Sequence, residues 1–133
     1  MILLDTHVLV WLDEGSNRLS KATIAMIDRA LLEDRLGVSA MTFWEVAMLL
    51  NKNRLEMSLP VSVWRKNLLA SGLKEIPVTG AIGVQAANLE DFHGDPADRI
   101  ITATALLHSA LLITADSRIL AWPGLEQKHD PAL

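Results

Sequence analysis

Short apolar runs alternate with segments of helical periodicity along this chain, and this alternation constrains its fold more than any other feature. Unbroken short apolar runs are typical of buried strands, whereas apolar residues spaced three or four apart are typical of helices. A chain that alternates between the two favours a parallel sheet covered by helices on both faces. We therefore expect an α/β fold, a three-layer α/β/α sandwich whose central, mainly parallel sheet has four or five strands.

The expected elements can be placed by their ends. The strands cover residues 2–4, 36–39, 74–77, 111–114 and, with the weakest pattern, 125–128. A short helix includes Trp11 and stops before Gly15, and longer helices cover 21–34, 41–53, 60–72, 79–89 and 96–109. Ser20 is a typical N-cap residue, and prolines at the start of a helix and glycine at its end are equally typical.

The 133 residues, half of them hydrophobic, are expected to form a single domain, 1–133, that buries roughly two thirds of its unfolded surface. Cysteine is absent, which excludes disulfides and thiolate metal sites. Asp5 interrupts the apolar start of the chain and no basic segment precedes it, which argues against a signal peptide. No run approaches the ~18 apolar residues of a membrane span, so we expect a cytoplasmic protein without a membrane partner.

Four acidic residues stand where an apolar run gives way to a helical pattern, although they are scattered along the chain: Asp5, Glu45, Asp98 and Asp116. All strands of an open parallel sheet end at one edge, and ligands bind outside that edge. We therefore expect the four carboxylates to share one pocket. Like charges gathered in this way need a cation.

Each acid also has a structural interpretation. Thr42 and Glu45 fit a capping box, Asp95 can cap the helix that Pro96 begins, and Asp98 then lies in its first turn. Such positions stabilise a helix by about 0.3–1 kcal/mol each. Asp5 is harder to explain in this way, because an unpaired carboxylate at the end of a buried strand costs several kcal/mol. Its expected partner is a metal ion or the side chain of Arg99.

Hard oxygen ligands favour Mg²⁺ or Mn²⁺ over zinc. The histidines show no mutual metal-ligand spacing, so none is assigned a role: His7, His93, His108 and His129. Three tryptophans, Trp44, Trp64 and Trp122, are interpreted as packing residues or interface anchors. The net charge is −4, from 12 basic and 16 acidic residues; without the four pocket acids the two signs balance, so charge does not decide whether the partner is a nucleic acid.

Four motifs in this order resemble the PIN-domain ribonucleases and, among them, the VapC-type toxins of type II toxin–antitoxin systems. They are Asp5-Thr6 after an apolar strand, the segment from Ser39 to Glu45, the pattern H-x-D-P-x-D-R at 93–99, and T-x-D-S at 114–117. The resemblance covers nearly the whole chain. It departs from many relatives at Leu49, where they carry a lysine, and at Ala97, where they often carry an aromatic residue.

The resemblance implies that Asp5, Glu45, Asp98 and Asp116 are catalytic and bind one or two Mg²⁺ or Mn²⁺ ions, with Asp5 and Asp98 as direct ligands. Thr6, Thr114 and Ser117 would support these acids. The implied reaction is hydrolysis of RNA phosphodiester bonds by metal-activated water, leaving a 3′-hydroxyl and a 5′-phosphate. Four basic residues are possible phosphate contacts or surface groups: Lys52, Arg54, Arg99 and Arg118.

The implied partners are RNA, a cognate antitoxin protein and a second copy of the chain, bound through apolar surface near the helices of Trp44 and Trp64. Three alternatives stay open: a PIN-domain RNA-processing nuclease without an antitoxin, a catalytically idle binding module, and a dehalogenase-like phosphatase. The phosphatase would need a second aspartate where His7 stands. A phosphoacceptor receiver module would need an acidic pair after the first strand, and Asp5 stands alone there.

Overall fold

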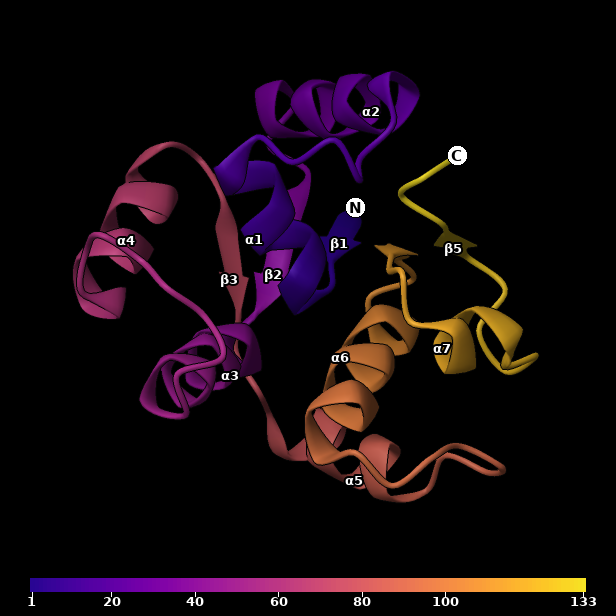
Figure 1. Ribbon diagram of the computed structural model, residues 1–133. Coiled ribbons are helices and arrows are strands. Elements are labelled where there is room, and N and C mark those ends of the chain that lie inside the picture. The colour runs from indigo at the N-terminus through magenta and orange to yellow at the C-terminus, as the bar shows by residue number, and fades with distance from the viewer.

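The protein is described by a computed structural model that covers residues 1–133. Its centre is a five-stranded sheet in the order β3-β2-β1-β4-β5, in which every neighbouring pair is parallel. The strands are β1 (Ile2–Leu4), β2 (Leu36–Ser39), β3 (Lys74–Ile76), β4 (Leu111–Ile113) and β5 (Lys128–His129). The expected parallel sheet, with its helices on both faces, is confirmed (Figure 1).

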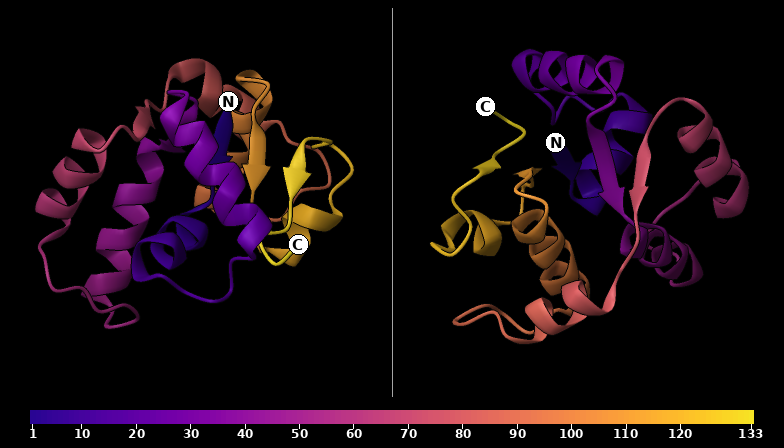
Figure 2. Two further views of the ribbon diagram at one scale, coloured as in Figure 1. Left: turned by 90° about the horizontal axis from the view of Figure 1, so that it is seen from above. Right: turned by 180° about the vertical axis from the view of Figure 1, so that it is seen from behind.

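Seven helices surround the sheet. They are α1 (Thr6–Glu14), α2 (Lys21–Leu32), α3 (Ala40–Asn51), α4 (Val61–Ala70), α5 (Gly80–Ala87), α6 (Pro96–Leu107) and α7 (Ser117–Ala121). In Figure 1 and in both views of Figure 2, α4 and α7 lie on opposite sides of the molecule. None of the helices combines the length and the apolar character that a membrane crossing requires.

The alternation of side chains along β1 divides the core into two layers. Ile2 and Leu4 pack in a cluster with side chains of α1, α2, α3 and α4, whereas Leu3 packs in a second cluster with side chains of α6 and α7. Leu3 and Leu4 are completely buried, as expected for the central strand of a sheet covered on both faces. The two layers hold the carboxyl ends of the strands in fixed positions.

Most helix starts follow from their first residues. The side chains of Ser20, Ser39 and Thr79 accept hydrogen bonds from backbone N–H groups of the helices that they precede. The helix after β2 therefore begins at Ala40, with Ser39 as its cap. The capping box expected from Thr42 is wrong, because Thr42 is buried within α3 and its hydroxyl lies 3.1 Å from that of Thr6.

Two differences from the expected elements lie near the C-terminus. The short helix α7 follows β4 and was not among the predicted helices. The last strand is Lys128–His129 rather than residues 125–128. Leu125, the apolar residue that suggested an earlier strand, is instead buried in the second core layer. A buried loop residue and a strand residue are equally apolar in sequence, so this shift has no signal in the pattern.

Candidate metal centre at the carboxyl edge of the sheet

The four scattered acids meet at one edge of the sheet. Asp5 directly follows β1, Asp116 follows its neighbour β4, and Glu45 lies one turn into the helix after β2. Asp98 is brought to the same edge by the first turn of α6. They line one cavity of about 260 Å³, together with His7, Trp11, Asp95, Ala115 and Arg118. The predicted convergence is therefore what the structure shows, whereas the catalytic and metal-binding roles of these residues stay predictions.

Asp5 is the most deeply buried of these acids, with 6% of its surface exposed. The backbone N–H of Thr6 donates to Oδ1 at 2.8 Å and the hydroxyl of Thr114 donates to Oδ2 at 2.6 Å. Burial nevertheless raises the pKa of the Asp5 carboxyl, and these two hydrogen bonds only partly oppose the shift. The carboxylate is thus fixed in place and short of positive charge.

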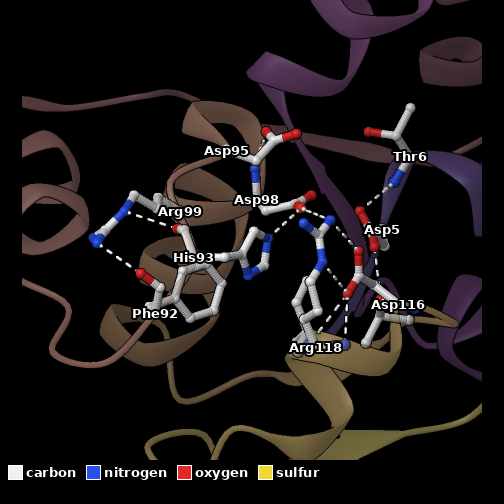
Figure 3. A network of polar contacts seen from close by, with 11 residues as sticks. Asp5, Thr6, Phe92, His93, Asp95, Asp98, Arg99, Asp116 and Arg118 are labelled. Carbon is white, nitrogen blue, oxygen red and sulfur yellow. Dashed lines mark hydrogen bonds and ion pairs between the residues drawn. The ribbon is translucent and has the colours of Figure 1, made fainter.

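Asp98 is oriented by a histidine. Nε2 of His93 lies 2.7 Å from Oδ2 of Asp98, and the His93 ring stacks on Phe92 with 4.4 Å between ring centroids (Figure 3). Burial raises the pKa of Asp98, the His93 hydrogen bond opposes the shift, and the negative charges of Asp5 and Asp95 add to it. Asp95 caps α6 by accepting a bond from the Asp98 N–H, so its predicted capping role is confirmed.

Asp116 differs from its neighbours because it has an arginine of its own. The guanidinium of Arg118 lies 3.1 Å from Oδ2 of Asp116 and 3.5 Å from Oδ2 of Asp98. Burial alone would raise the pKa of Asp116, but hydrogen bonds from the Arg118 side chain and from two backbone N–H groups of α7 lower it overall. Figure 3 shows the Arg118 guanidinium between the two carboxylates.

Glu45 leaves one oxygen without a partner. Its Oε1 is buried and makes no hydrogen bond. Burial raises the pKa of Glu45, and the charges of Asp5 and Asp98 raise it further. A buried carboxylate oxygen without a donor is unusual, since such groups normally find a hydrogen bond or an ion.

The hydroxyl residues expected to support the acids differ in their positions. Thr114 joins two acids, because its Oγ1 donates to Asp5 and accepts from the Asp116 N–H at 3.1 Å. Thr6 is completely buried and supports Asp5 through its backbone N–H. Ser117 is exposed at the start of α7 and makes no side-chain hydrogen bond.

The interpretation of Arg99 as a partner of Asp5 is wrong, whereas its role as a phosphate contact stays a prediction. Its guanidinium donates to the backbone carbonyls of Ala86, Leu89, Phe92 and His93, and it points away from the acids (Figure 3). These bonds fasten the 86–93 segment to α6, so Arg99 is a scaffold residue. The sequence placed Arg99 next to Asp98, but adjacent residues on a helix point in different directions.

The remaining basic and aromatic residues that the sequence singled out lie in different parts of the structure. Lys52 and Arg54 are exposed just beyond the end of α3 and do not line the acidic cavity. Trp64 is a core residue, 4% exposed, whose indole donates to Asp13. Trp122 packs edge-on against Phe92. Trp44 is 56% exposed and is the tryptophan that suits an interface.

The donor set fits a divalent cation. Atoms of His93, Asp98 and Asp116 that could serve as ligands all lie within 4.8 Å of one another. Five carboxylates line the cavity against the single guanidinium of Arg118, and one buried oxygen of Glu45 has no partner. Carboxylate oxygens with one imidazole suit a hard or borderline divalent ion.

Residues without a predicted role also stand at the site: His7 and Trp11 line the cavity, and His93 contacts Asp98. His93 carried a signal, because it opens the 93–99 motif that also contains Asp98. His7 and Trp11 lie on α1, two and six residues beyond Asp5, and both line the cavity. Their spacing of four residues is a helical spacing, but apolar neighbours on both sides hid it.

Comparison with known proteins finds relatives of this chain. The family model described as PIN domain matches residues 2–124. Ribonuclease VapC22 of Mycobacterium tuberculosis (strain ATCC 25618 / H37Rv) is 37% identical over 119 residues, which cover 89% of this chain and 88% of that protein.

Several solved structures have a similar fold. A chain of a toxin–antitoxin complex from Klebsiella pneumoniae superposes with a TM-score of 0.65 over 98% of both chains, and at 22% identity this likeness shows the fold alone. The crystal structure of FitAcB from Neisseria gonorrhoeae matches with a TM-score of 0.59 and 25% identity over 89% of both chains. The structure of FitAB bound to an IR36 DNA fragment matches with a TM-score of 0.59 and 26% identity, over 88% of this chain and 86% of that one. With its parallel sheet, its convergent acids and a family match over almost its whole length, this chain belongs to the PIN domain family.

Proposed function

We propose that this protein is a metal-dependent endoribonuclease that acts as the toxin of a toxin–antitoxin pair. The observation that carries the proposal is the cavity in which Asp5, Glu45, Asp98 and Asp116 meet with too little positive charge. The 37% identity to a ribonuclease supports the reaction class, and the likeness to a chain of a toxin–antitoxin complex supports the biological role. A cytoplasmic location fits this role and stays a prediction.

The proposed ion is Mg²⁺ or Mn²⁺, one or two in number. Asp5 and Asp98 are the proposed direct ligands, because hydrogen bonds already fix both carboxylates toward the cavity. Glu45 and Asp116 complete the acidic wall. When bound, the ion supplies Lewis acidity to the scissile phosphate and to water, and it offsets charge on the leaving oxygen.

The side chains of the cavity supply orientation and proton transfer. The Thr114 hydroxyl and the Thr6 N–H hold Asp5, and His93 holds Asp98, so neither carboxylate needs to reorganise when substrate arrives. We assign the role of proton acceptor to Glu45, because its Oε1 has no hydrogen-bond partner and burial raises its pKa, which makes the carboxylate a stronger base. Arg118 is exposed enough to leave Asp116 and contact a substrate phosphate.

We also propose two protein partners. An antitoxin segment fits a cavity of about 370 Å³ between α1 and α4, whose lining includes Val10, Met57, Leu59 and Leu68. A second copy of the chain fits the exposed surface of α3 around Trp44. Light scattering at micromolar concentration tests the dimer, and co-purification with the product of the adjacent reading frame tests the antitoxin.

The direct test of the enzymatic proposal is cleavage of RNA by the purified protein. We expect endonucleolytic products in Mg²⁺ or Mn²⁺ and none in EDTA. Glu75→Gln serves as a matched control, because it also removes a carboxylate, from β3, outside the acidic cavity. Equal cleavage in EDTA and in Mn²⁺ contradicts the proposed function.

A further inference from the structure

Beside the acidic cavity lies a second cavity of about 470 Å³, and the two share a wall formed by His7 and Trp11. Val10, Leu49 and Leu55 contribute apolar surface to the second cavity, and Arg54 contributes a positive charge. Its volume falls within the range of about 300–1,000 Å³ that is usual for small-molecule sites. No residue of this second cavity has a role in the proposed reaction.

Trp11 is half-buried, and its ring is held from two directions. His7 lies one turn earlier on α1, with its ring centroid 6.2 Å from that of Trp11. The guanidinium carbon of Arg18 lies 4.9 Å from the centroid of the indole. The indole is therefore oriented by neighbours that carry or can carry positive charge.

We propose that Trp11 is a stacking platform for a nucleobase of single-stranded RNA next to the scissile phosphate, with Arg54 and Arg18 contacting the flanking phosphates. The inference rests on the proposed ribonuclease function and deepens it by naming the substrate class. Single-strand binding sites combine an aromatic surface for bases with cations along the backbone, and this corner of the molecule has both.

The folded arrangement explains why the linear sequence hides this site. Arg18, Arg54 and Trp11 come from three separate segments, so no basic and aromatic residues alternate along the chain. In the structure Arg54 and Trp11 line the second cavity, Arg18 packs over the Trp11 ring, and Trp11 also lines the acidic cavity. The exposed Glu14 also lines the second cavity and balances the charge of Arg54 there, so the further positive charge at this corner comes from Arg18 over the Trp11 ring.

Stacking can be separated from electrostatic attraction by comparing two ligands that carry the same phosphates. One is a pool of 5′-fluorescein-labelled, 12-nucleotide RNAs of random sequence, and the other is a 12-mer of abasic ribonucleotides with the same label. Affinities are measured by fluorescence anisotropy with Mn²⁺ in an Asp98→Asn background, which keeps the RNA intact. Thermal melting of every variant is recorded alongside.

Trp11→Leu is expected to weaken binding of the RNA pool about ten-fold, because one base–aromatic stack contributes roughly that much, and to leave the abasic 12-mer within about two-fold. Trp11→Phe, which keeps an aromatic face, should retain most of the affinity for RNA. Arg54→Gln should weaken both ligands by a similar factor, since it removes a phosphate contact. Trp122→Leu, outside both cavities and outside the surfaces proposed for protein partners, is the matched control and should change neither.

Three results overturn the proposal. An equal loss on both ligands means that Trp11 is only a packing residue, and no loss on either means that no base stacks there. If Trp11→Leu leaves RNA binding unchanged but weakens binding of the antitoxin, the cavity belongs to the protein partner. Cleavage of the RNA pool by the wild-type protein in Mn²⁺ is measured first: its absence overturns the ribonuclease and the platform together, whereas cleavage without a selective Trp11 effect overturns the platform alone.

Discussion

Two groups of charged residues at the sheet differ in how their charge is balanced. On the edge strand β3, Glu75 accepts two bonds from Arg65, at 2.7 and 2.8 Å, and this pairing lowers the pKa of Glu75 despite some burial. At the carboxyl edge of the central strands, burial and mutual repulsion instead raise the pKa of Asp5 and Asp98. The same chemical group is thus stabilised in one place and destabilised in the other.

This difference in charge balance distinguishes an acid that stabilises the fold, Glu75, from the acids that could bind a ligand in the cavity. A bidentate ion pair is complete without any ligand. The acidic cavity is incomplete, because its one guanidinium, on Arg118, faces five carboxylates. Perturbed pKa values gathered in a cavity are characteristic of functional sites. Burial of apolar side chains in the two core layers around β1 offsets the free-energy cost of the crowded carboxylates.

The largest expected contrast between the two groups is in catalysis. Asp98→Asn or Asp5→Asn should reduce RNA cleavage by at least about 10³-fold with the fold intact, since metal-ion catalysis contributes several kcal/mol. Glu75→Gln should leave cleavage unchanged. Initial rates in Mn²⁺, with circular dichroism of each variant, check this prediction. Full activity of either aspartate variant contradicts it.

The next contrast is in stability without metal. Asp5 binds its proton more tightly in the folded state, so the free energy of unfolding falls as pH rises from the ordinary value of 3.8 through the raised pKa. In EDTA at pH 7, Asp5→Asn should therefore stabilise the protein by about 1–2 kcal/mol, within the usual range of single substitutions. Urea unfolding from pH 4 to pH 8 measures the effect, and a wild-type stability that rises across this range speaks against it.

A smaller effect concerns metal affinity. Arg118 partly neutralises Asp98 and Asp116, so its removal should strengthen the attraction of the cavity for a divalent ion. We expect Arg118→Gln to bind Mn²⁺ about five-fold more tightly, which corresponds to about 1 kcal/mol, the strength of a charge pair about 4 Å apart in bulk water. The solvent value applies because 57% of the Arg118 side chain is exposed. Arg65→Gln is the control and should bind as the wild type does. Titration of free Mn²⁺ by electron paramagnetic resonance gives both affinities, and weaker binding by Arg118→Gln rejects the idea.

The smallest effect is expected for the ion pair between Arg65 and Glu75. Glu75→Gln should cost less than about 1 kcal/mol, because 39% of the Arg65 side chain is exposed and exposed ion pairs contribute little. Because the pKa of Glu75 is lowered in the folded protein, the ion pair stabilises the fold fully above pH 4.5, the ordinary pKa of the group. This stabilisation is lost as the pH falls through the folded-state pKa. Urea unfolding at pH 7 and pH 3 should show a larger difference at pH 7 than at pH 3. A larger cost at pH 3 than at pH 7 reverses the sign and contradicts the prediction.

Much of the fold could be predicted because its signals are local. Leu3 lies in an apolar run, Ser20 caps a helix, and Asp5 stands at the end of a strand, so each carries its position in neighbouring residues. The convergence of the acids followed from one topological rule about parallel sheets. Directions of side chains have no such signal. Arg99 was expected at the acids and His93 was assigned no role, yet His93 contacts Asp98 and Arg99 binds backbone carbonyls, because a turn of helix and a loop decide which side chain faces the site.

The prediction that the acids share a divalent ion can be tested most directly by anomalous diffraction from crystals grown with Mn²⁺. We predict an anomalous peak from a Mn²⁺ ion within bonding distance of carboxylate oxygens of Asp5 and Asp98. Crystals of Asp98→Asn at the same Mn²⁺ concentration should show no such peak. Wild-type crystals without anomalous density in the acidic cavity at millimolar Mn²⁺, or with all of it elsewhere on the surface, would contradict a shared metal centre.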